Sequence, residues 1–282
     1  MNDGKTNVSF VIVTWNSKNE IAECIRSVKS DVPQAELIIV DNHSSDGTIE
    51  ILEKLCSEFS GIRVILNEDN FGYTKACNQA MKLATGDYIF LLNPDTILTN
   101  GVTGTLISSM KNEICAAAPQ LINDDGSVQF SCRTFPRYRD MYFEIFQLPR
   151  LFPASSFFNR WKMGGFSHDE SKLVDQPMAA ALILKREILA KVGFMDERFF
   201  MFFNDVDLCK SVSDAGGKIL FNPDAKISHS KGVSVFKVRK QMIDIWKKDC
   251  LSYFEKYFGL NLKFYVFRVV LSFVTFIRNL TA

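Results

Sequence analysis

Two carboxylates of this chain come directly after apolar runs that are typical of buried strands. Asp95 follows Tyr88-Ile89-Phe90-Leu91-Leu92 and the pair Asn93-Pro94, and Asp41 follows Glu36-Leu37-Ile38-Ile39-Val40. Such runs indicate strands that are covered on both faces of a parallel sheet. Ligands of open α/β sheets bind at the carboxyl ends of the strands, so Asp95 is well placed to hold a divalent cation and, through it, a phosphate. The alternative is that Asn-Pro-Asp is an ordinary turn that ends the strand.

Alternating strands and helices have to position these carboxylates. We expect strands at residues 8–14, 36–40, 63–66 and 85–92, each followed by a polar loop, and helical spacing of apolar residues between them. Strands and helices that alternate in this way form βαβ units and a parallel sheet. The ligand edge of that sheet would carry Thr14, Asp41, Asn70 and Asp95. The chain contains neither GxGxxG nor a P-loop lysine motif, which argues against a classical dinucleotide or Walker-type ATP site.

The composition is that of a globular protein. The chain has 282 residues, of which 47% are hydrophobic, and this is ample for a substantial core. A net charge of +1 argues against nucleic acid as a partner. The seven cysteines form no CxxC pair, which favours reduced thiols over a zinc site or a disulfide framework. Because the sequence shows no signal peptide and no membrane span, we expect a cytoplasmic protein whose oligomeric state is open.

Four short strings carry a resemblance to a known family. VTWNS, VDNHSSDGT, NFGYTKACN and LLNPD follow one another within residues 13–95. In this order and at these spacings they resemble the nucleotide-sugar half of an inverting family 2 glycosyltransferase with a GT-A fold. The form with NPD in place of the more usual DxD is similar to bacterial rhamnosyltransferases. The resemblance implies an α/β fold with a mostly parallel central sheet flanked by helices.

A second motif resembles the acceptor side of the same family. Residues 193–209, GFMDERFFMFFNDVDLC, are similar to the family's GxFDExFFMYxEDVDLCxR pattern. Asp205 corresponds to the family's catalytic base, while Asn204 replaces the usual Glu and Ser211 occupies the arginine position. The alternative is that Asp205 and Asp207 are helix N-terminal carboxylates that the helix dipole favours.

The resemblance implies a role for each of several side chains. Those assigned to the donor are Thr14, Asn16, Asp41, Asn70, Lys75, Asn93 and Asp95; those assigned to the acceptor are Met178, Asn204 and Asp207; Asp205 is the base. Asp95 and His229 are the candidates to hold Mg²⁺ or Mn²⁺, with a structural histidine as the alternative for His229, which opens an HxxGxS-like element at residues 229–234. Asp41 would accept the imide N–H of uracil or thymine, which cytosine lacks at that ring nitrogen.

These roles describe a transferase that moves a sugar from a dTDP- or UDP-sugar, with rhamnose as the first candidate. The acceptor would be a hydroxyl of a glycan or lipid-linked glycan in cell-surface polysaccharide synthesis, and the reaction would invert the anomeric carbon. One alternative is a degenerate nucleotide-sugar-binding subunit without transfer activity, which Asn204 favours. Another is a sugar-nucleotide pyrophosphorylase, although residues 14–17 read Thr-Trp-Asn-Ser where that class has a glycine-rich loop.

The expected domain plan is a GT-A domain over residues 1–236, divided into a nucleotide-sugar half (1–100) and an acceptor half (101–236), followed by a tail over 237–282. Within the acceptor half, residues 138–166 are aromatic and basic and are broken by Pro149 and Pro153, so we expect either a cover for the core or an acceptor surface.

The tail is basic and rich in aromatic residues. It holds nine Lys or Arg against three Asp or Glu. Its apolar run, residues 264–277, would be about 21 Å long as a helix and therefore too short to span a bilayer core of about 30 Å. We expect either a helix that lies in the interface of an acidic membrane, which would make the protein peripheral on the inner face of the cell membrane, or a pair of helices that pack on protein.

Overall fold

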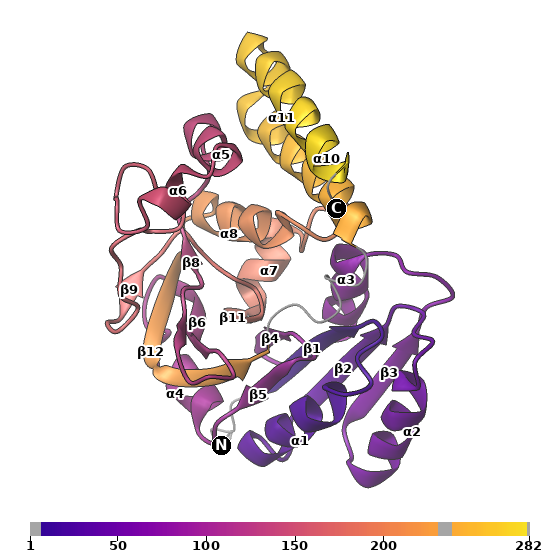
Figure 1. Cartoon of the computed structure of the whole chain (residues 1–282). Helices are drawn as coiled ribbons and strands as arrows, with labels where there is room; N and C mark the ends of the chain where they lie inside the picture. Colours follow the sequence, from indigo (N-terminus) through magenta and orange to yellow (C-terminus); the bar gives the residue numbers. More distant parts are fainter. Residues whose placement is uncertain (1–6, 231–238, 281–282) are drawn as a thin grey trace.

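A mixed sheet forms the centre of the molecule (Figure 1). The computed structural model describes residues 7–230 and 239–280. In the described residues the main path of the sheet runs in the order β3-β2-β1-β4-β11-β6-β12-β5. The strands on this path are β1 (Val8–Thr14), β2 (Glu36–Asp41), β3 (Ile62–Leu66), β4 (Tyr88–Leu92), β5 (Thr96–Leu98), β6 (Ile114–Ile122), β11 (Ala181–Lys185) and β12 (Lys218–His229). Strands β1 to β4 are parallel, which confirms the expected α/β architecture, and β11 joins them antiparallel to β4.

Helices cover both faces of this sheet. On one face lie α1 (Ile21–Asp31), α2 (Thr48–Glu58) and α4 (Val102–Ser109), and on the other α3 (Tyr73–Leu83), α7 (Arg186–Val192) and α8 (Asn204–Asp214). Alternate residues of one strand serve the two layers: Phe10 and Ile12 pack toward α1, whereas Val11 and Val13 pack toward α3. This alternation explains why the strands are continuous apolar runs.

Further short strands lie between residues 128 and 177. They are β7 (Val128–Gln129), which pairs with β6; β9 (Lys172–Leu173), which pairs with β12; and β8 (Cys132–Arg133) and β10 (Gln176–Pro177), which pair with each other. After β10 the chain leaves the ladder at residues 178–180 and enters the main sheet as β11. Met178 N–H bonds to Ser131 O and Ala180 O accepts from Asn93 N–H, so this short linker bonds to two different parts of the fold.

The tail consists of two helices, α10 (Arg239–Phe258) and α11 (Leu262–Leu280), which lie side by side (Figure 1). They form a third core with α5 (Tyr138–Ile145), in which Tyr253, Phe254 and Phe267 pack against Phe199 and Phe203 of the acceptor motif. The short α6 (Leu148–Leu151) follows α5. The tail therefore packs on residues of the acceptor motif through one face, and its aromatic residues Tyr253, Phe254 and Phe267 are core residues. In the described part of the chain, none of the helices combines the length and the apolar character needed to cross a bilayer.

Candidate functional site

The ends of β1 and β2 form a polar floor at the carboxyl edge of the sheet. Thr14 and Asp41 are partners in the register of these two strands. The Asp41 carboxylate is fully buried and accepts hydrogen bonds from Ser44 N (2.8 Å) and Ser44 Oγ (2.5 Å). Asn16 lies beside it, donating its N–H to Ser44 Oγ and accepting from Ser45 N with its side-chain oxygen, both at 2.8 Å. The loops after both strands are thus tied together by their own polar side chains.

This floor retains capacity for a ligand. A carboxylate offers about four lone-pair sites, and Asp41 uses one on each oxygen. Thr14 Oγ1 is buried and has no hydrogen-bond partner in the described residues. A buried hydroxyl without a partner costs free energy unless a bound group satisfies it.

The loop after β3 is shaped by amides that the sequence analysis did not single out. Asn67 Nδ2 donates to Asn42 Oδ1 (2.8 Å), and Asn42 Nδ2 donates to Gly72 O (3.1 Å). Asn70 uses its side-chain oxygen to accept from Gly72 N, while Lys75 is exposed with its ammonium 3.9 Å from the centre of the Phe71 ring. Asn70 therefore shapes the loop, and Lys75 is separate from the Thr14–Asp41 floor in this conformation.

Asp95 and His229 face each other across neighbouring strands. His229 Nε2 lies 3.4 Å from Asp95 Oδ1, and His229 Nδ1 lies 2.7 Å from Gln129 Oε1. Gln129 donates a hydrogen bond from its amide nitrogen to Asn123 Oδ1, so its side-chain oxygen is the atom that accepts from His229 Nδ1. The Nδ1 atom of His229 therefore carries the proton. In the neutral imidazole the Nε2 lone pair then points at Asp95 Oδ1, which is buried and has no hydrogen-bond partner in the described residues.

Two lone-pair atoms in this position require a proton or a cation between them, and oxygen and imidazole ligands suit Mn²⁺, while Mg²⁺ prefers oxygen. The described residues contain no group of three or more His, Cys, Asp or Glu that could hold a metal. The two side chains supply two ligands, so a cation held between them would need its remaining ligands from water or a bound substrate. The HxxGxS-like element continues beyond Ser230 into residues outside the described ranges.

Asp205 is the second residue of α8. Its Oδ2 accepts from Gln176 Nε2 (2.9 Å), and its Oδ1 accepts from Val206 N (2.8 Å). Burial raises the pKa of this carboxyl above its ordinary value, against the opposing effect of hydrogen bonds from the backbone N–H groups of Val206 and Ala179. A carboxylate with a raised pKa is a better proton acceptor.

The linker at residues 178–180 joins Asp205 to the donor edge. Ala179 N–H bonds to the Asp205 carboxylate, while the next residue, Ala180, accepts from Asn93 N at 2.9 Å. Asn93 comes two residues before Asp95. The linker thus bonds to the candidate base and to the turn that precedes Asp95, and Met178 lies partly exposed at its start.

The other two acceptor candidates are engaged in internal contacts. Asn204 is buried, donates to Thr74 Oγ1 (3.1 Å) and accepts from Asp205 N (2.6 Å). Asp207 is buried against α10, where Lys256 Nζ (2.6 Å) and Tyr257 OH (2.7 Å) donate to it. The side chain of Asn204 therefore contacts Thr74 and the backbone of Asp205, and the side chain of Asp207 faces α10 of the tail.

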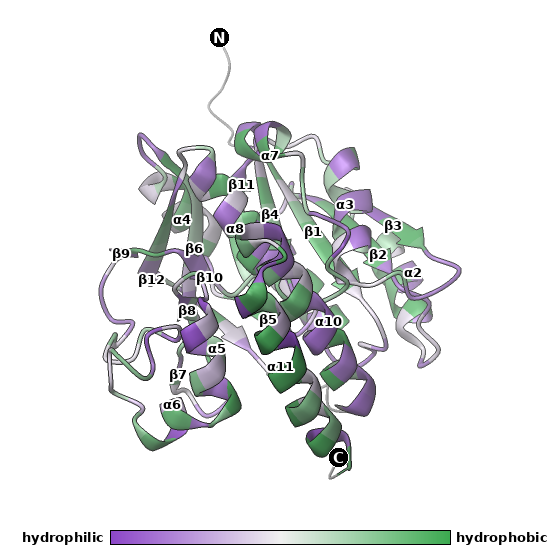
Figure 2. Cartoon of the chain, turned by 90° about the horizontal axis from the view of Figure 1, so that it is seen from above, coloured by the Kyte–Doolittle hydropathy of each residue, from purple (hydrophilic) through white to green (hydrophobic). Residues whose placement is uncertain are grey.

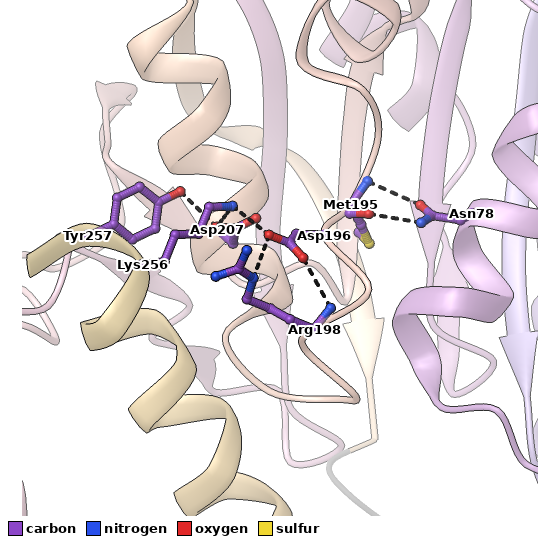
Figure 3. Close-up of polar contacts among 7 residues, drawn as sticks. All are labelled: Asn78, Met195, Asp196, Arg198, Asp207, Lys256 and Tyr257. Atoms are coloured by element: carbon purple, nitrogen blue, oxygen red, sulfur yellow. Dashed lines mark hydrogen bonds and ion pairs between the residues drawn. The ribbon is translucent and has the colours of Figure 1, made fainter. Parts of the chain in front are cut away.

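The acceptor motif, residues 193–209, is held in place by contacts with α3 and with α10 (Figure 3). On α3, Asn78 exchanges two hydrogen bonds with the Met195 backbone; on α10, Lys256 lies between Asp196 (2.9 Å) and Asp207. Asp249, also on α10, is buried and accepts from the consecutive N–H groups of Phe200, Met201 and Phe202. The sequence analysis missed these residues, although an acid next to Cys250 in an otherwise basic segment is a signal that could have identified Asp249.

Comparison with known proteins identifies the family of the chain. The model of the family described as "Glycosyl transferase family 2" matches residues 9–167, which are more than half of the chain. The chain is 26% identical over 212 residues to the N-acetylglucosaminyl-diphospho-decaprenol L-rhamnosyltransferase of Mycobacterium tuberculosis, covering 70% of this chain and 67% of that protein. It is 24% identical over 226 residues to the rhamnosyltransferase WbbL of Escherichia coli, covering 77% and 80% of the two chains.

A solved structure shares the fold. GalNAc-T7, crystallised with UDP, GalNAc and Mn²⁺, superimposes with a TM-score of 0.62 at 16% identity; the match covers 83% of this chain and 45% of GalNAc-T7. That similarity shows the fold alone, and it extends the GT-A assignment to most of the chain. The protein described here belongs to glycosyl transferase family 2 and has the GT-A fold.

Proposed function

We propose that the protein transfers a sugar from a dTDP- or UDP-sugar to a hydroxyl of a lipid-linked glycan, with inversion at the anomeric carbon, in cell-surface polysaccharide synthesis. The observation that carries this proposal is that the linker at residues 178–180 bonds to the Asp205 carboxylate through Ala179 N–H and to Asn93, two residues before Asp95, through Ala180 O. Two relatives named as rhamnosyltransferases make rhamnose the first candidate sugar. The name of one of them includes a diphospho-decaprenol, which supports a lipid-linked acceptor.

The donor nucleotide would lie on the Thr14–Asp41 floor. Asp41 would accept the imide N–H of uracil or thymine with a remaining lone pair, and the unpartnered Thr14 hydroxyl would bond to the base or the ribose. Asn16, Asn70 and Asn93 belong to the loops that would surround the nucleotide, and Lys75 lies in the first turn of α3. A purine cannot present an imide edge in the same place, and cytosine lacks the N–H, so the floor would select for uracil and thymine.

Asp95 and His229 would hold Mg²⁺ or Mn²⁺ at the diphosphate. When bound, such an ion supplies neutralisation of the charge that develops on the departing nucleotide. His229 is fixed for this role because Gln129 keeps the proton on Nδ1.

Asp205 would take the proton of the acceptor hydroxyl as that hydroxyl attacks the anomeric carbon in line. Gln176 and the two backbone donors hold the carboxylate in place, and Asn204 fixes the backbone from behind. One carboxylate is sufficient, since a nucleoside diphosphate leaves without being protonated, unlike the leaving group of a glycoside hydrolase.

Asn204 also supports a second candidate, a nucleotide-sugar-binding subunit without transfer activity, because it replaces the family's Glu. The raised pKa and the ordered contacts of Asp205 favour the enzyme. Turnover separates the two candidates directly.

The test uses the full chain with UDP, dTDP, GDP and ADP, each with Mn²⁺, with Mg²⁺ or with EDTA. UDP or dTDP at 100 times its Kd should stabilise the protein by about 2.7 kcal/mol, which is readily seen as a shift in Tm, and the shift should shrink in EDTA. Release of dTDP from dTDP-rhamnose in the presence of N-acetylglucosaminyl-diphospho-polyprenol would demonstrate transfer. Protection by GDP alone would contradict the pyrimidine assignment, and transfer that is insensitive to EDTA would contradict the metal assignment.

A further inference from the structure

A basic cleft is lined in part by α8, the helix that carries Asp205 near its start. Its volume is about 670 Å³, and it lies between the start of α5, the middle of α8 and the turn that joins α10 to α11. Five cationic side chains line it, Arg137, Arg139, Arg160, Lys210 and Lys263, with Asp175 as the acidic one. The charge of this cleft thus differs sharply from the near-neutral balance of the whole chain.

Three of these cations are available to a ligand. Arg160 is paired with Asp140, and Lys210 with Asp214. Arg137, Arg139 and Lys263 have no ion pair with a carboxylate within the described ranges; Arg139 instead lies over the rings of Phe143 and Phe157. Arginine forks bind phosphate oxygens in pairs, so this arrangement fits a phosphate or diphosphate group.

The cleft is close to Asp205 along two elements. Asp175, which lines the cleft, immediately precedes Gln176, the donor to Asp205 Oδ2. Lys210 lies five residues after Asp205 on α8, which is about 7.5 Å along the helix axis. Five residues also turn the helix by about 140°, so the sugar on a phosphate held at Lys210 would have to extend around α8 to reach Asp205.

Exposed apolar residues lie on or follow the helices that supply Arg139 and Lys263 to the cleft. On α11, the residues Leu262, Tyr265, Val266, Val269, Phe273 and Phe276 repeat at helical spacing on the face opposite the buried Phe264, Phe267 and Leu271. Val269 is 70% exposed, Phe273 63% and Phe276 61%. Across the cleft, Phe146, Leu151, Phe152 and Phe157 are exposed in and after α5 and α6. Both groups lie at the end of the molecule where α5, α6 and α11 gather, and the apolar residues of α11 are visible in Figure 2.

We propose that this cleft binds the phosphate or diphosphate group of the lipid-linked acceptor, with the lipid chain lying against the apolar face of α11. The inference rests on the proposed transferase function and adds to it the part of the site that recognises the acceptor. Arg137, Arg139 and Lys263 neutralise the anion, the two apolar groups contact the lipid, and the sugar on the phosphate extends toward Asp205.

The test measures binding of farnesyl diphosphate to the full chain in EDTA, so that a metal-bound diphosphate at Asp95 does not contribute. The cleft variant is Arg139→Gln with Lys263→Gln. The matched control is Lys82→Gln with Lys226→Gln, which removes two exposed cations elsewhere. We expect the cleft variant to lose affinity by about 10-fold or more and the control to stay within about two-fold of the wild type.

Three comparison ligands identify what the cleft recognises. Inorganic pyrophosphate and farnesol should each bind at least about 10-fold more weakly than farnesyl diphosphate. Equal binding of farnesyl diphosphate by the cleft variant and the control would overturn the proposal. So would pyrophosphate binding as tightly as farnesyl diphosphate, or a cleft variant that loses only its attachment to phosphatidylglycerol vesicles, because the cleft would then serve free anions or ordinary lipid headgroups.

Thermal protection by UDP and dTDP is measured on the same samples. Protection that is equal in the wild type and the cleft variant shows that the donor edge is intact, so that a loss of farnesyl diphosphate binding belongs to the cleft. Absence of protection in the wild type would contradict the proposed function, while the farnesyl diphosphate result would still report on the cleft.

Discussion

The donor edge and the acceptor side of this molecule are built in different ways. The donor edge consists of strand ends and the loops that follow them, and its side chains bond mainly to neighbouring loops, as Asn16 and Asp41 do through Ser44. The acceptor side is assembled from distant parts of the chain: Asn204 bonds to Thr74, 130 residues away, and Asp249 to Phe200, 49 residues away. The donor edge is thus a property of the sheet, whereas the acceptor side depends on the tail.

The largest effect should come from the acceptor side. Asp205→Asn removes the proposed base but preserves the shape of the side chain, so kcat should fall by about 10²- to 10⁴-fold while the Kd for UDP or dTDP changes by no more than a few-fold. Steady-state kinetics and calorimetric titration with nucleotide give the two numbers. A parallel loss of nucleotide affinity would show that Asp205 supports the donor edge as well, and the two regions would no longer be separable.

The reciprocal change on the donor edge is Asp95→Asn. Because the proposed cation acts on both the bound diphosphate and the departing one, nucleotide affinity in Mn²⁺ and turnover should fall together, with turnover reduced by about 100-fold or more. Nucleotide affinity in EDTA should be nearly the same for wild type and variant. An affinity that drops equally with and without the metal would assign Asp95 a structural role.

A third change tests the dependence on the tail. Asp249→Ala leaves the N–H groups of Phe200, Met201 and Phe202 without their acceptor, and we expect it to lower the free energy of unfolding by about 2 kcal/mol. The matched control is Asp244→Ala, an exposed acid on the same helix, which should cost less than about 0.5 kcal/mol. Urea titration measures both values. At a temperature where both variants are folded, turnover should fall more than UDP affinity in Asp249→Ala, and an equal fall would contradict the separation of the two regions.

Removing the whole tail is a poorer experiment. Truncation before α10 would uncover Phe199 and Phe203, which pack against Tyr253 and Phe254, so the remaining chain would lose a core. Point substitutions on the exposed face of α11, such as Phe273→Ser, leave that core in place. They test membrane contact with little effect on folding.

The strand ends could be predicted from the sequence because their signal is local. A continuous apolar run followed by a polar cluster predicts both the strand and the edge where its last residues lie. Strands β1 and β2 end at Thr14 and Asp41, and β4 ends at Leu92, three residues before Asp95. Phe267 and Phe273 show the limit of such reasoning: they stand on the same helix, yet Phe267 is buried and Phe273 is 63% exposed. Which face of α11 is covered depends on α5 and α10, whose positions no local pattern records.

The contacts of Asp207 could not be predicted for the same reason. The family motif includes this residue, but its environment is set by Lys256 and Tyr257, which come from a segment of different composition 49 and 50 residues later. Sequence reasoning therefore identified the residues of the motif and missed the ones that hold it.

The smallest expected effect is a shift in pH dependence, and it again distinguishes the two regions. Burial raises the pKa of Asp205, and the base acts only when it is deprotonated, so kcat/KM should fall with acid at a pH above the ordinary range of an aspartate. Gln176→Leu removes a hydrogen bond to the charged carboxylate and should move this acid limb to a still higher pH. The pH dependence of thermal protection by UDP should be the same in this variant as in the wild type.

The stability of the protein should depend on pH through the same group. A folded-state pKa above the unfolded value means that Asp205 adds stability at low pH and that this contribution is lost as the pH rises through the folded pKa. Asp205→Asn should therefore not lower the free energy of unfolding at neutral pH. As the pH is lowered, the Tm of the variant should fall relative to that of the wild type. An acid limb that Gln176→Leu leaves unmoved would show that another group controls it, and the assignment of Asp205 as the base would lose its electrostatic support.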